Sequence, residues 1–182
     1  TSSLLLSSTL ISYSANLALA QEESTLNLFS KESSGFSLPY TKDETAFDLL
    51  ALTSEPLLVL SKEGERLHEW LVQEIDTNDG GINWILTLRN GIEWSDGEVL
   101  NTEDIKFTFE QILNSENFSA RTAVELRARV SSVAVIDDLK FIVTLRNADL
   151  RFPHQFLTAR REGTFYVLPE HVWSGNSATF ST

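Results

Sequence analysis

The sequence predicts an α/β fold, and three segments carry that prediction. Apolar and polar residues alternate from Ile82 to Leu88, as in a half-buried strand. A capped amphipathic helix follows Asn101, and a second alternating pair of runs, Val133 to Leu145, predicts a hairpin. Strands and helices therefore mix within one stretch of about 60 residues.

The segments before this stretch are shorter. A brief strand is expected at 25–29, and a Ser-, Gly- and Pro-containing loop at 31–41. A helical face in 42–55 is interrupted by Pro56, after which Leu57 to Leu60 predicts a strand. A turn is expected at 62–65, and Trp70 to Val72 reads as a short connecting element.

In the strand that follows, Ile82, Trp84, Leu86 and Leu88 are expected to point to one side, with Ile85 as the exception on the other. The dipeptides Asn90-Gly91 and Asp96-Gly97 predict turns.

The helix after these turns has a defined beginning. Asn101 is a favourable N-cap residue, and Asp104 holds the position from which a capping box accepts the reciprocal bond. Four apolar residues recur on one face at helical spacing: Ile105, Phe109, Ile112 and Leu113. Phe107 lies off this face.

The rest of the chain predicts further elements. The segment 121–129 is compatible with a helix, and Asp137-Asp138 forms the turn of the hairpin. Because Thr-Leu-Arg-Asn occurs at 87–90 and again at 144–147, we expect two similar strands of one sheet. A strand is expected at 166–168, followed by a helical turn at 169–173.

The composition excludes several functional classes. The net charge of −12 disfavours nucleic-acid binding, since nucleic-acid-binding surfaces are basic. The absence of Cys removes disulfides, thiolate metal sites, Cys nucleophiles and an N-terminal lipid anchor. His68, His154 and His171 show no metal-ligand spacing, and neither a GxSxG elbow nor a phosphate loop is present. The sequence therefore predicts no cofactor, no metal and no enzyme activity.

The first 20 residues are apolar, rich in hydroxyl groups and uncharged, and they end in Ala18-Leu19-Ala20. This pattern predicts the remnant of a secretory signal peptide at 1–20, with a disordered or helical arm as the alternative. Because the chain contains no Met, we expect it to lack its natural start.

The stretch TLRNGIEWSDGEVLNTEDIKFTFEQIL, 87–113, resembles the signature region of the family 5 extracellular solute-binding proteins, the receptors of bacterial ABC importers. Ser54-Glu55-Pro56-Leu57-Leu58 and Leu168-Pro169-Glu170-His171-Val172-Trp173 are similar to flanking segments of that family. The resemblance implies a periplasmic-binding-protein type II-like fold, with a mixed-sheet lobe and a family-specific α+β subdomain. The second lobe is expected to be absent from this chain.

The resemblance further implies a domain division: 21–55 in the first lobe, 56–155 as the extra subdomain, and 156–182 returning to the first lobe. It implies a monomeric periplasmic receptor that delivers oligopeptides to permease subunits in the inner membrane. An oligosaccharide or a metal chelate is the alternative ligand, and a secreted interaction domain or hydrolase fragment is the alternative of another class.

By resemblance, ligand-binding residues are expected in two places. The first is the loop and helix start of Lys42, Asp43, Glu44, Thr45 and Phe47, and the second is Phe152, His154 and Gln155 near the return to the first lobe. Solvated surface is the alternative role for the charged residues, and core packing for the aromatic ones. The signature stretch itself is assigned to the framework.

Overall fold

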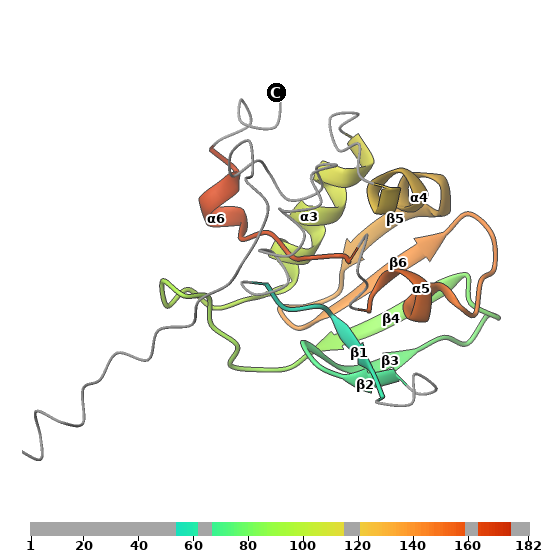
Figure 1. The fold of residues 1–182 in the computed structure, drawn as a ribbon, viewed down its shortest axis with the longest axis horizontal. Helices are drawn as coiled ribbons and strands as arrows, with labels where there is room; N and C mark the ends of the chain where they lie inside the picture. The colour runs from blue at the N-terminus through green and yellow to red at the C-terminus, as the bar shows by residue number, and fades with distance from the viewer. Residues whose placement is uncertain (1–53, 62–66, 115–120, 159–163, 176–182) are drawn as a thin grey trace, which may run out of the picture. The chain divides into compact units, whose positions relative to one another are not determined.

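The computed structural model describes residues 54–61, 67–114, 121–158 and 164–175, and Figure 1 shows their arrangement. The elements follow in the order β1 (Leu58–Leu60), β2 (Leu67–Glu69), β3 (Val72–Asp76), β4 (Asn83–Leu88), α3 (Thr102–Asn114), α4 (Arg121–Arg129), β5 (Val130–Val135), β6 (Lys140–Leu145), α5 (Phe152–Phe156) and α6 (Glu170–Trp173). In the part of the chain so described, no helix is long and apolar enough to cross a membrane.

The central sheet has four antiparallel strands in the order β3-β4-β6-β5, and β1 and β2 form a separate two-stranded sheet. The two copies of Thr-Leu-Arg-Asn begin in β4 and β6, which are paired neighbours, so the prediction of two strands in one sheet is confirmed. The hairpin prediction is also confirmed, although β5 begins at Val130, three residues earlier than expected.

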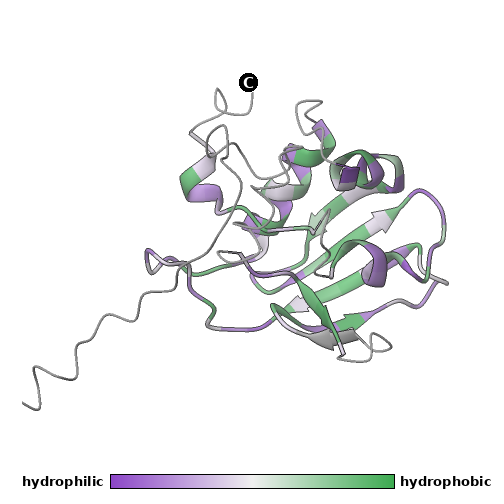
Figure 2. Ribbon diagram, viewed as in Figure 1, coloured by the Kyte–Doolittle hydropathy of each residue, from purple (hydrophilic) through white to green (hydrophobic). Residues whose placement is uncertain are grey.

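One face of this sheet forms the core. Trp84, Leu86 and Leu88 of β4 are buried, while the alternate residues of the strand are half-buried. The same alternation continues in β6, with Phe141, Val143 and Leu145 buried. Figure 2 shows this as hydrophobic colouring along both strands, whereas α4 is largely hydrophilic. The prediction for Ile82 is wrong: it precedes β4 and is 39% exposed.

Helix α3 packs beside β5 and α4 (Figure 1), and its start is the predicted capping box. The amide of Glu103 donates to the Asn101 side-chain oxygen over 2.8 Å, and the Asn101 amide donates to Asp104 Oδ2 over 3.1 Å. Ile105, Phe109 and Ile112 are fully buried. The capped start and this apolar face explain why the helix forms here.

Two predicted elements differ from the structure. Strand β3 begins at Val72, within the expected connecting element, because Val72 pairs with Leu88 of β4. Tyr166 to Leu168 is buried but does not form the expected strand. Tyr166 makes an isolated antiparallel bridge with Pro56, two residues before β1. The predicted elements at 25–29, 42–55 and 62–65 lie outside the described residues.

The chain approaches and leaves the central sheet at neighbouring positions. The Leu58 amide donates to Leu157 O over 2.9 Å, and Leu58 forms a parallel bridge with Thr158. Segments about 100 residues apart in sequence are thus held together by backbone hydrogen bonds. This is the arrangement expected where a chain passes twice between two parts of a protein. The predicted boundaries at 55 and 155 remain a prediction.

The turn before β4 depends on Gly81. Its φ is +92°, and a Cβ placed on it would lie 2.9 Å from the Asp149 carbonyl carbon. We therefore expect Gly81→Ala to lower the free energy of unfolding by about 2–3 kcal/mol, since both the positive φ and the backbone contact oppose a side chain.

The control is Gly80→Ala. Gly80 also has a positive φ, +74°, but nothing lies within 4 Å of its added Cβ. Its expected loss is about 1 kcal/mol, from the backbone alone. Urea denaturation of both variants measures the difference, and equal losses would show that the approach of Gly81 to Asp149 is unimportant for stability.

Candidate functional site

The first group of predicted ligand-binding residues, Lys42, Asp43, Glu44, Thr45 and Phe47, lies outside the described residues. The second group lies on or beside α5. This five-residue helix has Phe152 and Pro153 in its first turn. Proline is favourable there because the first N–H groups of a helix have no partner within the helix. The positions of the predicted ligand-binding residues can therefore be described only for the second group.

Phe152 is fully buried, and its ring stacks on Phe156 with centroids 5.5 Å apart. With no exposed surface, the ring packs in the core, as the core-packing alternative expects, and a ligand role for Phe152 stays a prediction. His154 is exposed and Gln155 is half-buried on the same helix. The His154 carbonyl accepts from Thr158 Oγ1 over 2.9 Å, which fixes the end of α5. A ligand role for His154 and Gln155 stays a prediction.

Asp104 joins the signature stretch to the returning segment of the chain. It is 4% exposed, and its carboxylate accepts hydrogen bonds from Trp94 Nε1 over 3.2 Å and from the Glu170 amide over 2.8 Å. The Asn101 amide bond of the capping box is a third. A helix-capping residue therefore also satisfies the first amide of α6, 66 residues later in the chain.

Thr108, one turn further along α3, repeats this connection. Its buried hydroxyl donates to Asp104 O over 2.7 Å and accepts from the Leu168 amide over 2.8 Å. The sequence does not predict this role of Thr108, because a single threonine inside an amphipathic helix carries no local signal of a distant partner. Asp104 and Thr108 together hold segment 168–170 against α3.

A third contact at this junction is an ion pair on the surface. His171 Nε2 lies 2.8 Å from Asp96 Oδ2, which connects α6 to the Asp96-Gly97 turn. The hydrogen bond with Asp96 raises the pKa of His171 above its ordinary value of 6.5, and the same bond lowers the pKa of Asp96 below 3.8. The junction is therefore strongest where both groups are charged.

The pH dependence of this pair has a defined sign. The raised pKa of His171 means that its contribution is complete below pH 6.5 and is lost as the pH rises through the folded-state pKa. The lowered pKa of Asp96 means that its contribution to stability is complete above pH 3.8 and is lost as the pH falls through the folded-state pKa.

We expect His171→Gln to lower the melting temperature most between pH 3.8 and pH 6.5 and least above neutral pH. Thermal unfolding of both proteins across pH 4 to 9 measures this, and a difference independent of pH would contradict it.

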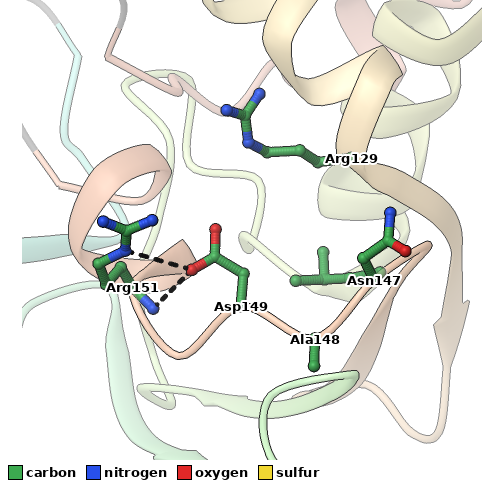
Figure 3. A pocket seen from close by; sticks show the side chains of 6 residues that line it. Arg129, Asn147, Ala148, Asp149 and Arg151 are labelled. Carbon is green, nitrogen blue, oxygen red and sulfur yellow. Dashed lines mark hydrogen bonds and ion pairs between the residues drawn. The ribbon is translucent and has the colours of Figure 1, made fainter.

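A cavity of about 260 Å³ lies between the end of α4 and the loop that follows β6 (Figure 3). It is lined by Arg129, Leu145, Asn147, Ala148, Asp149 and Arg151. Figure 3 shows Arg129 and Asp149 directed into the space between the two segments. The sequence does not predict this cluster. Arg129 lies 18 residues before Asn147, the next polar residue of the lining, and no motif connects the two.

No group of three His, Asp or Glu side chains in 54–61, 67–114, 121–158 and 164–175 is arranged to hold a metal ion. At the hairpin turn, Asp137 Oδ1 accepts from the amides of Leu139 and Lys140.

Solved structures with a similar fold are solute receptors. The oligopeptide-binding protein AppA of Bacillus subtilis, solved with a nonapeptide, matches with a TM-score of 0.64 and 21% identity over 80% of this chain and 28% of its own. A dipeptide-binding protein of Pseudoalteromonas sp. SM9913, solved with Met-Leu, matches with a TM-score of 0.65 and 16% identity over 79% and 31%. A periplasmic oligopeptide-binding protein of Thermotoga maritima, solved with mannohexaose, matches with a TM-score of 0.58 and 21% identity over 69% and 22%.

These likenesses confirm the predicted fold, a mixed α/β structure of the periplasmic-binding-protein type. The chain spans less than a third of the length of each of these three proteins. No curated protein sequence matches it. The model of the middle region of the bacterial extracellular solute-binding proteins, family 5, matches residues 66–171, which include β2 to β6, α3, α4 and α5. The chain belongs to the family 5 bacterial extracellular solute-binding proteins.

Proposed function

We propose that the protein is the solute-binding receptor of a bacterial ABC importer, and that it captures oligopeptides and delivers them to a membrane permease. The observation that carries the proposal is the family match over 66–171. Two of the similar solved structures were determined with bound peptides, a nonapeptide and a dipeptide, which supports a peptide as the ligand. The protein would work outside the cytoplasm, in the periplasm, as a monomer without a cofactor.

In this proposal, binding energy is used to favour a closed form of the receptor. A ligand held between two lobes contacts both of them only when they are closed, so it shifts the population toward that form. The closed form is then the one that docks on the permease. Such a receptor needs no catalytic group, only shape, charge and hydrogen-bonding groups that match the ligand.

The described residues would supply the framework of this receptor. The bonds of Asp104 and Thr108 to segment 168–170 hold the subdomain 56–155 against the returning chain. The proposed ligand contacts are Lys42, Asp43, Glu44, Thr45 and Phe47, together with His154 and Gln155 on α5. Lys42 or Glu44 would pair with a charged peptide terminus. Phe152, which is buried, would hold α5 in place by packing in the core.

An oligosaccharide is the second candidate ligand. It is supported by the Thermotoga maritima structure, whose protein carries the name of an oligopeptide receptor and was solved with mannohexaose. Peptides and oligosaccharides differ in charge, because only a free peptide carries an ammonium and a carboxylate at its ends. Ionic strength therefore separates the two classes in a binding experiment.

The test is a thermal-shift screen of the whole gene product against pools of peptides with two to nine residues and of oligosaccharides. At a concentration 100 times its Kd, a true ligand adds about 2.7 kcal/mol to the stability. We expect a saturable rise in melting temperature with peptides, reduced by salt. A rise with oligosaccharides alone selects the second candidate. Hydrolysis of either pool, or no rise with any member, would contradict a receptor function.

A further inference from the structure

The cavity beside α4 contains a cation, Arg129, that has no carboxylate partner among the residues that the structure describes. Arg129 is half-buried, and its guanidinium lies over the Phe156 ring with Cζ 4.8 Å from the centroid. Its hydrogen bond is from Nη1 to the Glu125 carbonyl, over 3.3 Å. None of the ion pairs among the described residues includes Arg129. A guanidinium has five N–H donors, and the side-chain bond to Glu125 uses one of them within the described part of the chain.

The acidic residue of the cavity is already compensated by another arginine. Asp149 Oδ1 accepts the Arg151 backbone amide over 3.0 Å and lies 3.7 Å from Arg151 Nε. The Asp149 amide itself donates to Gly81 O over 3.1 Å, which fixes the loop. Figure 3 shows the Asp149–Arg151 pair on one side of the space and Arg129 on the other. The lining therefore carries one positive charge in excess.

From this arrangement we propose that the cavity binds a small aliphatic carboxylate, with Arg129 as its principal partner. The planar guanidinium fork matches the two oxygens of a carboxylate. One excess positive charge suits a monoanion better than a phosphate dianion, because the Asp149 carboxylate repels a dianion more strongly. Leu145 and Ala148 supply apolar wall for a short carbon chain, and Asn147 supplies an amide at the rim. The volume of about 260 Å³ is sufficient for a molecule of this size but small for an oligopeptide.

This proposal does not depend on the receptor function. The lining residues come from the end of α4, the end of β6 and the loop 147–151, which leads directly into α5. The cavity would bind a carboxylate whether or not the protein captures oligopeptides.

The test is a titration of the ¹⁵N-labelled whole gene product with butyrate, followed by heteronuclear NMR at constant ionic strength. Butyramide is the uncharged control ligand, and inorganic phosphate is the alternative anion. We expect saturable shifts at the Arg129 side-chain Nε–H and at the amides of 147–151, with butyrate bound at least tenfold more tightly than butyramide or phosphate. Equal binding of butyramide, or tighter binding of phosphate, would overturn the proposal.

Variants test the assigned roles in opposite directions. Arg129→Gln should weaken butyrate binding at least tenfold, and Asp149→Asn should strengthen it several-fold because a neighbouring negative charge is removed. Arg121→Gln is the matched control, since Arg121 is an exposed arginine of the same helix that pairs with Glu125, and its affinity should match wild type. If Arg129→Gln does not fold, Arg129→Lys and Asp149→Asn decide the question. Unchanged affinity in both would show that Arg129 does not bind the anion.

Discussion

Replacing Phe109 by alanine is expected to lower the free energy of unfolding by about 4 kcal/mol, the typical loss for a fully buried phenylalanine. Phe109 has no exposed surface, and its ring stacks on Phe165 with centroids 4.5 Å apart. The substitution therefore removes the ring contact between α3 and the returning segment and leaves a cavity in the core. Urea denaturation followed by tryptophan fluorescence measures the loss.

Two further variants keep this expectation testable if Phe109→Ala does not fold. Phe109→Leu preserves most of the buried volume and should lose only about 1–2 kcal/mol. Phe107→Ala is the control on the same helix, where the half-buried ring lies at the edge of the core, and it should lose less than half as much as Phe109→Ala. A loss of under 1 kcal/mol for Phe109→Ala would contradict the central position of this ring.

Replacing Asp104 by alanine is expected to lower the free energy of unfolding by about 3 kcal/mol. Hydrogen bonds to a charged group contribute about 1.5–3 kcal/mol each, and they do not add fully when they share one carboxylate. The variant leaves three donors without their acceptor: Trp94 Nε1 and the amides of Asn101 and Glu170. Because one of these belongs to α6, hydrogen exchange in 168–173 should accelerate more than exchange in the hairpin β5-β6.

The matched control for this variant is Glu110→Ala, which removes an exposed carboxylate from the same helix. Its expected effect is within about 0.5 kcal/mol, as for ordinary surface substitutions. If the two variants lose the same stability, the Asp104 carboxylate acts through general charge effects on the helix and not through its three hydrogen bonds.

The elements that the sequence predicted best are those whose signals are local. The capping box of Asn101 and Asp104 lies within four residues, and the alternation of β4 repeats every second residue, so both follow from short-range geometry. The prediction for Ile82 failed because alternation does not show where a strand begins. The Asp79 side chain ends the turn by accepting the amides of Ile82 and Asn83.

The features that the sequence did not predict depend on long-range contacts. The partners of Asp104 and Thr108 lie about 60 residues further along the chain, and the cavity combines residues of α4 with a loop that follows β6. Nothing in the neighbourhood of Arg129 distinguishes it from Arg127, although only Arg129 lines that cavity. For Lys42, Asp43, Glu44, Thr45 and Phe47, ligand contact remains a prediction that rests on resemblance to the family.

We expect the signature stretch, 87–113, to serve as framework and not as the ligand site, and Trp94 is the residue that tests this most directly. Its indole is partly exposed, as a ligand contact would be, but it packs against the core and donates to Asp104. The decisive measurement compares peptide affinity and unfolding free energy of the whole gene product and its Trp94→Ala variant. We expect a loss of about 2 kcal/mol in stability and a change of less than about twofold in the affinity of the folded protein. Affinity reduced tenfold or more with unchanged stability would contradict the account.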